Sequence, residues 1–212
     1  MMDVFQLTSF QKDILKEIGN IGAGNAATSL SQLLGHKIDM LVPNVEIADF
    51  NEVIELVGGP EQPIVGLMFQ VEGEITGVMA IVVDIEEAEY LVQKLTHNPE
   101  FRLSEETDGI ELEIAMSALS EIGNILTGSY LTALSDFTGM NLQPSVPHLG
   151  IDMAGAIMTM GLLEISQVTD YAIIIDTEIR QEERGHEQIR GNFLFIPDPE
   201  SFQKLFAKLG WS

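Results

Sequence analysis

The chain contains an internal repeat, which limits the folds available to it. Residues 17–45 and 121–149 align without a gap at an offset of 104, and twelve of their 29 positions are identical. The segments "DIEEAEYLVQKL" (84–95) and "DPESFQKLFAKL" (198–209) are also similar. Because each repeat forms one supersecondary unit, we expect a single domain of two pseudo-symmetric halves, at about 1–104 and 105–212.

Hydrophobic period and turn residues predict the same order of elements in both halves. Helices are expected over about 9–34, 51–57 and 86–95, and again over about 108–136, 153–165 and 199–209. Strands are expected over about 37–47, 63–71, 74–84, 141–150, 171–180 and 188–197, with a hairpin turn around Glu72 and Gly73. The hairpin strands are apolar on both faces in places, so helices should cover the sheet. The predicted fold class is α+β, with helices packed on a largely antiparallel β-sheet.

Charge and composition exclude several classes of partner. The 33 acidic and 10 basic residues give a formal charge of −23, which repels nucleic acid and anionic lipid. We therefore expect no nucleic-acid partner and no membrane insertion, although acidic excess is also a common solubility device. No apolar run is long enough to span a bilayer, no signal-peptide pattern is present, and there is no cysteine. These features favour a cytoplasmic protein.

The first repeat opens with "EIGNIGAGNAA" (17–27), in which Gly19, Gly22 and Gly24 are closely spaced. Such glycines could form a phosphate-binding loop or lie within a helix. The helix is favoured because no predicted strand precedes the segment, and because the second copy has Leu126 in place of Gly22. Each glycine inside a helix costs about 1 kcal/mol relative to alanine. Close approach of another backbone or of a partner protein should offset that cost.

Each long helix is expected to carry one polar stripe. At about 100° per residue, four motif positions fall within about 60° of one another. They are Asp13, Glu17, Asn20 and Gly24 in the first copy, and Ser117, Glu121, Asn124 and Gly128 in the second. The adjoining side, with Ile14, Ile18 and Ile21, should be buried. A solvated helix face would explain one such stripe, but its repetition favours a functional site.

The residue types of the stripe limit its chemistry. An asparagine amide has no useful pKa, but its donors and acceptor can hold a water in line with an electrophile. A glutamate beside a phosphoryl group is repelled unless it meets a cation, so a salt bridge to a partner's Lys or Arg is the sensible role. Phosphoryl transfer otherwise needs positioning and a metal. The histidines show no ligand spacing, so we expect no metal site or cofactor in this chain; they are His36, His97, His148 and His186.

The complete pattern resembles that of the CheC/CheX/FliY family of chemotaxis phosphatases. The family pattern is Asp or Ser, three residues, Glu, two residues, Asn, twenty-two residues and Pro, and both copies complete it, at Pro43 and Pro147. The resemblance implies hydrolysis of the aspartyl phosphate of a CheY-like response regulator that brings its own Mg²⁺. It implies that Asn20 and Asn124 orient water, while the two glutamates pair with a regulator lysine. The remaining motif residues are expected to support or flank the site.

The resemblance also implies a second partner, the chemoreceptor deamidase CheD. The segment "GIDMAGAIMTMG" (150–161) resembles the helix used for that contact, with Asp152 at its centre. An ordinary Met-rich helix packed on the sheet remains an alternative for this segment. The alternative function is a regulatory module that controls CheD and docks phosphorylated CheY with little catalysis. Trp211 is compatible with either packing or an exposed contact.

Overall fold

The computed structural model describes residues 7–104, 107–163, 171–181 and 188–210. Residues 182–187, in the long loop expected between the last two strands, and Trp211 lie outside this part. The elements are α1 (Ser9–Leu34), β1 (Ile38–Leu41), β2 (Val45–Asp49), α2 (Phe50–Leu56), β3 (Pro63–Gly73), β4 (Gly77–Asp84), α3 (Ile85–Thr96), α4 (Gly109–Thr138), β5 (Leu142–Pro144), β6 (His148–Met153), α5 (Ala154–Leu163), β7 (Tyr171–Gln181), β8 (Gln188–Pro197) and α6 (Pro199–Lys208).

The strands form one antiparallel sheet in which the two halves interlock. The strand order is β1-β7-β8-β4-β3-β5, with β2 also beside β7 and β6 also beside β3. The strands that follow each long helix therefore pair with the hairpin of the other half. The two hairpins meet where β4 pairs with β8. Neither half completes the sheet alone, so the chain is a single α+β domain of two pseudo-symmetric halves, as predicted.

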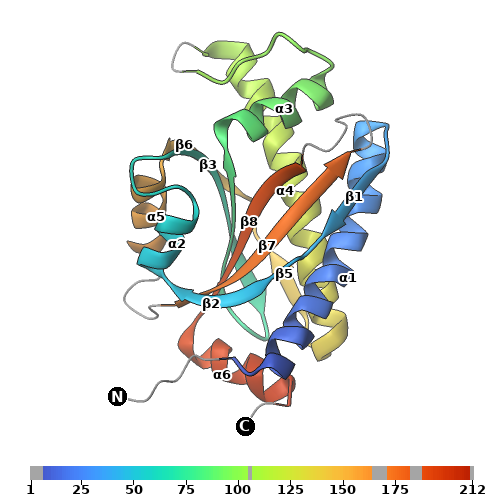
Figure 1. The fold of residues 1–212 in the computed structure, drawn as a ribbon, viewed down its shortest axis with the longest axis vertical. Helices are drawn as coiled ribbons and strands as arrows, with labels where there is room; N and C mark the ends of the chain where they lie inside the picture. Colours follow the sequence, from blue (N-terminus) through green and yellow to red (C-terminus); the bar gives the residue numbers. More distant parts are fainter. Residues whose placement is uncertain (1–6, 105–106, 164–170, 182–187, 211–212) are drawn as a thin grey trace.

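Helices cover both faces of the sheet. The long helices α1 and α4 lie side by side and run in opposite directions, while α2 and α5 lie together away from them (Figure 1). The larger core lies between the sheet and the long helices, and a smaller one lies under α2 and α5. This double burial explains why β4 is buried along almost its whole length. Within the described residues, no helix is long and apolar enough to cross a membrane.

The ends of the long helices follow local sequence signals. Thr8 and Gln11 form a capping box, in which the Gln11 amide N–H donates to Thr8 Oγ1 at 3.3 Å and the Thr8 amide N–H donates to Gln11 Oε1 at 2.8 Å. Gly35 ends α1 with a φ of 72°, and Gly139 ends α4 with a φ of 69°. A backbone with positive φ favours glycine because it has no Cβ. These caps fix where each helix begins and ends.

Several predicted boundaries were wrong. The segments expected as single strands, 37–47 and 141–150, are each split in two near Pro43 and Pro147. Proline has no N–H for the ladder, so pairing stops there. The β3–β4 turn lies at residues 74–76 rather than around Glu72 and Gly73, because β3 continues through Gly73. Ile21 is 44% exposed rather than buried.

Candidate functional site

The structure places each polar stripe on the outer side of its own long helix. Glu17, Gly24, Glu121 and Asn124 are exposed, whereas Asn20 is half-buried. Asp13 and Ser117 are also exposed, one turn before the glutamates. Among the described residues, no hydrogen bond or ion pair joins the stripe of α1 to that of α4. The helices run in opposite directions, so the repeat yields two separate candidate sites.

In the first copy, Asn20 is tied to the chain segment that carries Pro43. The Val42 amide N–H donates to Asn20 Oδ1 at 2.9 Å, and Asn20 Nδ2 donates to the Lys16 carbonyl at 3.0 Å. Val42 is only 1% exposed, so its N–H has no access to water. In this copy β1 returns along the helix, and its pairing ends at Leu41, so that Val42, just before Pro43, faces Asn20.

In the second copy, the corresponding loop leaves Asn124 free. Ser145 anchors this loop to β3, since its N–H donates to the Gln70 carbonyl at 2.8 Å and its Oγ accepts from the Gln70 N–H at 2.9 Å. Val146, the counterpart of Val42, is 79% exposed. The Asn124 side chain has no hydrogen-bond partner within the described part of the chain. The two sites therefore share the Glu–Asn pair and the glycine of the stripe but differ in the environment of the asparagine.

The helix glycines have two different roles. A Cβ on Gly22 would lie 2.8 Å from Tyr130 Cδ1 and 3.0 Å from Tyr130 Cα, so the close approach of α1 and α4 requires glycine there. A Cβ on Gly24 or Gly128 would meet nothing within 4 Å. Packing inside the chain therefore does not explain Gly24 and Gly128. Their position beside the Glu–Asn pairs favours the close approach of another molecule.

Neither glutamate of the stripes forms an ion pair that stabilises the described part of the fold. Glu17 and Glu121 are exposed, and neither forms an ion pair with any residue that the structure describes. Their carboxylates are free to meet a cation from outside the chain. Within the described ranges, no group of three or more His, Asp or Glu side chains is arranged to hold a metal ion. A metal brought by a partner stays a prediction.

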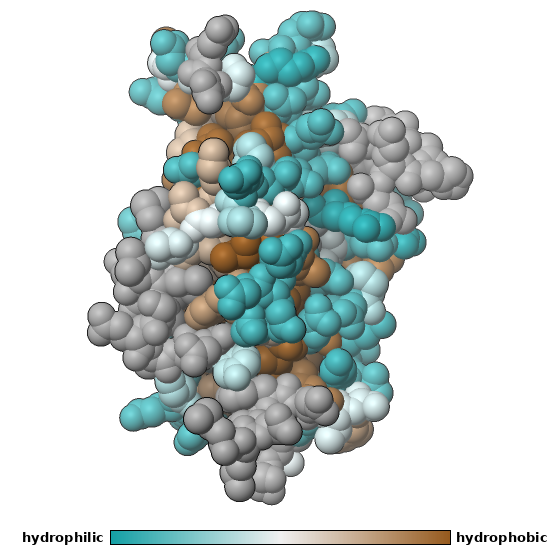
Figure 2. Space-filling view, turned by 60° about the vertical axis from the view of Figure 1, so that its left-hand side comes forward, coloured by the Kyte–Doolittle hydropathy of each residue, from teal (hydrophilic) through white to brown (hydrophobic). Residues whose placement is uncertain are grey.

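Asp152 lies on a strand and not on a helix, which corrects the sequence-based expectation. It pairs with Ile64 near the end of β6, and α5 begins only at Ala154. The Asp152 carboxylate accepts a hydrogen bond from the Met153 N–H at 2.7 Å and is otherwise exposed. The side of the molecule that carries α2 and α5 shows apolar areas interrupted by polar side chains (Figure 2). The sequence neighbours of Asp152, Ile151 and Met153, are 37% and 52% exposed.

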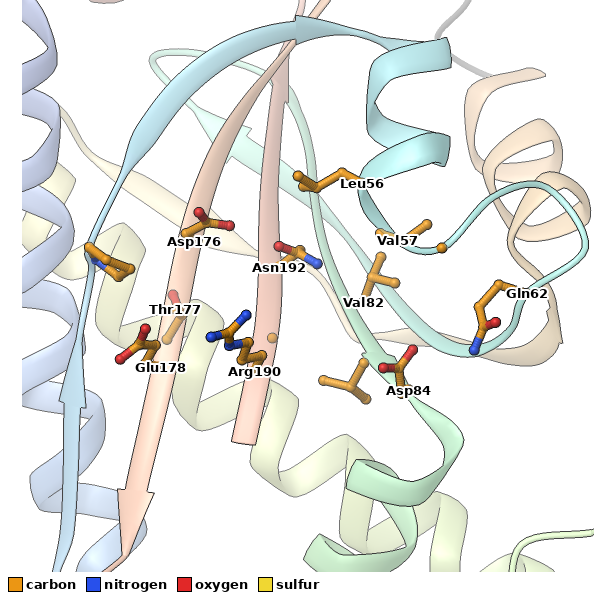
Figure 3. Close-up of a pocket in the computed structure, with 14 residues that line it drawn as sticks. Leu56, Val57, Gln62, Val82, Asp84, Asp176, Thr177, Glu178, Arg190 and Asn192 are labelled. Carbon is orange, nitrogen blue, oxygen red and sulfur yellow. The ribbon is translucent and has the colours of Figure 1, made fainter. Parts of the chain in front are cut away.

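A cavity of about 550 Å³ lies on the sheet face opposite the long helices. Asp176, Glu178, Arg190 and Asn192 surround its polar part (Figure 3). Burial raises the pKa of the Asp176 carboxyl above its ordinary value, and the charge of Glu46 raises it further. Among the described residues, Pro43 is the one residue of the repeated motif that lines the cavity. The cavity is therefore separate from both Glu–Asn pairs.

The raised pKa of Asp176 predicts that its substitution increases the stability of the fold, by an amount that depends on pH. At neutral pH, the ionised carboxylate is disfavoured in the folded state, so Asp176→Asn should increase the free energy of unfolding. The gain should fade as the pH falls through the folded-state pKa toward the ordinary value of 3.8, because protonation removes the penalty from the natural protein. Urea unfolding between neutral and acidic pH measures this. An equal gain at every pH would contradict the assignment, and Asp176→Glu, which keeps the charge, is the control.

Sequence reasoning missed the partner of Asn20 and the inequality of the two copies. A signal for the first was present, because Val42 directly precedes Pro43 in the strand that returns along α1. A signal for the second was Ser145, which stands where the first copy has Leu41. Leu41 continues β1, whereas Ser145 follows the end of β5 and binds β3 through its side chain. This single polar replacement accompanies the change in the path of the loop.

Comparisons with known proteins are consistent with this geometry. A model of the CheC-like family matches residues 10–47 and 114–151, which are the two stripes with the strands that follow them. The "CheY-P phosphatase CheC" of Bacillus subtilis is 43% identical over 95% of this chain and 95% of that protein. The "Flagellar motor switch phosphatase FliY" of the same organism is 28% identical over 69% of this chain and 37% of that protein. The crystal structure of Thermotoga maritima FliY superimposes with a TM-score of 0.75 at 25% identity, covering 96% of this chain and 98% of that one.

Proposed function

The chain belongs to the CheC-like family, and from that premise we propose that it hydrolyses the aspartyl phosphate of a CheY-like response regulator. The observation that carries the proposal is the second copy of the stripe. There, Glu121 and Asn124 are exposed and have no partner within the described residues, and the space over Gly128 is open. A pair of polar side chains that the fold does not use is suited to a partner's reactive group.

The proposed reaction divides the work between the two proteins. The Asn124 carboxamide oxygen accepts a hydrogen bond from a water O–H, which directs a lone pair of the water at phosphorus. The water oxygen bonds to phosphorus as the bond to the regulator's aspartate breaks. The electron pair of the broken bond leaves with the aspartate carboxylate, and both hydrogens of the water end on the inorganic phosphate. Glu121 pairs with a regulator lysine and fixes the orientation of the two proteins. The regulator supplies the Mg²⁺ that balances the phosphoryl charge, so this chain contributes mainly positioning.

The first copy performs the same reaction only after Asn20 changes partners. To face outward, its carboxamide gives up the hydrogen bond from the Val42 N–H, which is then left unpaired in a buried position. An unsatisfied buried donor costs about 1–3 kcal/mol, which corresponds to roughly a 5- to 150-fold disadvantage. We therefore propose that the second copy supplies most of the activity.

The proposal is tested by following phosphate loss from a phosphorylated CheY-like receiver domain in Mg²⁺. The intact protein, at catalytic concentration, is expected to increase the rate well above the regulator's own rate. Chelation of Mg²⁺ should remove the increase, because the metal belongs to the regulator's site. An unchanged rate across all concentrations of the protein would contradict the proposal.

We also propose that CheD contacts the surface around Asp152. The exposed carboxylate of Asp152 at the end of β6 supports this, since it suits a partner with a complementary cation, and the exposed neighbours Ile151 and Met153 add apolar surface to the same strand end. Asp152→Lys should weaken CheD binding at least tenfold, because reversing a charge within an interface is unfavourable. Calorimetric titration with CheD measures the effect. The basal rate of phosphate loss should be the same in Asp152→Lys as in the intact protein. Equal CheD binding by Asp152→Lys and the intact protein would contradict this assignment.

A further inference from the structure

Two exposed apolar side chains occupy the same position of the repeat. Phe10 on α1 is 69% exposed and Ile114 on α4 is 48% exposed. They lie 104 residues apart, which is the offset of the repeat. Among the described residues, no other pair at this offset has a large apolar side chain exposed in both copies. A single exposed apolar residue needs no explanation, but its recurrence at the same position of both copies, once beside each Glu–Asn pair, indicates an interaction.

Both residues lie in line with the Glu–Asn pairs. Phe10 precedes Glu17 by seven residues, so it lies on nearly the same side of α1, about 10 Å further along the axis. Ile21, four residues beyond Glu17, is 44% exposed on the same side. Each glutamate thus lies between two apolar side chains, since Ile114 and the half-buried Ile125 flank Glu121 in the same order.

The charge around the second pair indicates what can cover it. The segment Gly109–Thr138 contains no lysine or arginine. The side chains of Glu111, Glu113 and Glu121 are exposed around Ile114. A partner that covers Ile114 therefore needs an apolar depression with positive charge at its rim. The lysine proposed to meet Glu121 is one such charge, so one partner surface can engage both residues.

Given the phosphatase function proposed above, we infer that Phe10 and Ile114 are anchors for the phosphorylated receiver domain. Each anchor inserts into an apolar depression of the regulator, next to the lysine that pairs with the glutamate. Aromatic and large aliphatic side chains that become fully covered contribute most to such interfaces. The anchors act through affinity and touch no reacting atom. They are specificity-determining residues, whereas the asparagines determine the rate of hydrolysis.

Binding of a receiver domain treated with beryllofluoride, a stable mimic of the aspartyl phosphate, tests the anchors without catalysis. The Phe10→Ala/Ile114→Ala variant should bind about tenfold more weakly than the intact protein, which is about 1.4 kcal/mol. Phe10→Leu/Ile114→Leu should restore most of the affinity, because it returns apolar surface. The matched control is Leu56→Ala, which removes a side chain that is 41% exposed on α2, away from the long helices (Figure 1), and should leave binding unchanged.

Steady-state phosphate release separates this inference from the phosphatase proposal. The anchor variant should need about tenfold more regulator for half-maximal rate, with a maximal rate close to that of the intact protein. Unchanged affinity and unchanged half-saturation in the anchor variant would overturn the inference while the phosphatase function stood. An intact protein that binds the regulator through the anchors but releases no phosphate would overturn only the phosphatase function. Failure of the intact protein to bind the regulator would overturn the anchors as well.

Discussion

Replacing Asn124 by alanine should slow regulator-dependent phosphate release about 100-fold at the second site, because the attacking water is no longer held in line. The substitution should leave the free energy of unfolding almost unchanged. The Asn124 side chain is exposed and makes no hydrogen bond within the described residues, so the fold loses no contact. The residual rate in Asn124→Ala should come from the first site.

Asn20→Ala should lower the stability of the fold more than Asn124→Ala does, and should lower phosphate release less. It removes the acceptor of the buried Val42 N–H, so the free energy of unfolding should fall by about 1–3 kcal/mol. Phosphate release should fall much less than in Asn124→Ala, because the first site contributes the smaller share. Chemical denaturation and phosphate release, measured on both single variants, check the two effects together. Equal losses of activity in the two variants would contradict the inequality of the sites.

The second large effect concerns two glycines separated by a single residue. Gly22→Ala should lower the free energy of unfolding by about 1–3 kcal/mol, since its Cβ would meet Tyr130, including the Cα of its backbone, and force α1 and α4 apart. Gly24→Ala should instead raise it by about 1 kcal/mol, because alanine favours the helix and its Cβ meets nothing within 4 Å. Thermal and urea unfolding of the two variants measures this difference in sign.

Alanine in place of Gly24 or Gly128 should make the protein more stable but less active. A methyl group at Gly24 or Gly128 projects into the space that the regulator is proposed to occupy. Gly128→Ala should therefore raise stability and lower the affinity for the regulator, with a greater effect on total phosphate release than Gly24→Ala. A loss of function that accompanies a gain of stability cannot result from misfolding. Full activity in Gly128→Ala would show that the open space is not part of the interface.

The sequence was sufficient to predict the fold class and the stripes because both depend on local periodicity. The repeat, the Thr8 capping box and Gly35 determine where α1 begins and ends. Helical spacing then places Glu17 beside Asn20. Exposure depends on neighbours far away in the chain, so the prediction for Ile21 failed. Helical spacing alone does not show how far the buried face extends around α1.

The inequality of the two asparagines was not predictable from the motif. Both copies have the same Asn and the same Val–Pro pair, with the same spacing. The difference arises from contacts between the halves, where Ser145 binds the Gln70 backbone of β3. Asp152 was placed on a helix because its segment resembles one. Pairing with Ile64 across the sheet instead keeps it in a strand.

The double variant Asn20→Ala/Asn124→Ala decides whether the two stripes are the phosphatase sites. The rate at which a phosphorylated CheY-like regulator loses phosphate in Mg²⁺ is measured with the double variant and with the intact protein. Binding of the beryllofluoride-treated regulator is measured for both proteins as well. We expect a rate equal to that of the regulator alone, with regulator binding and the folded state retained. A folded double variant that still accelerates phosphate loss would show that the two stripes are not the phosphatase sites.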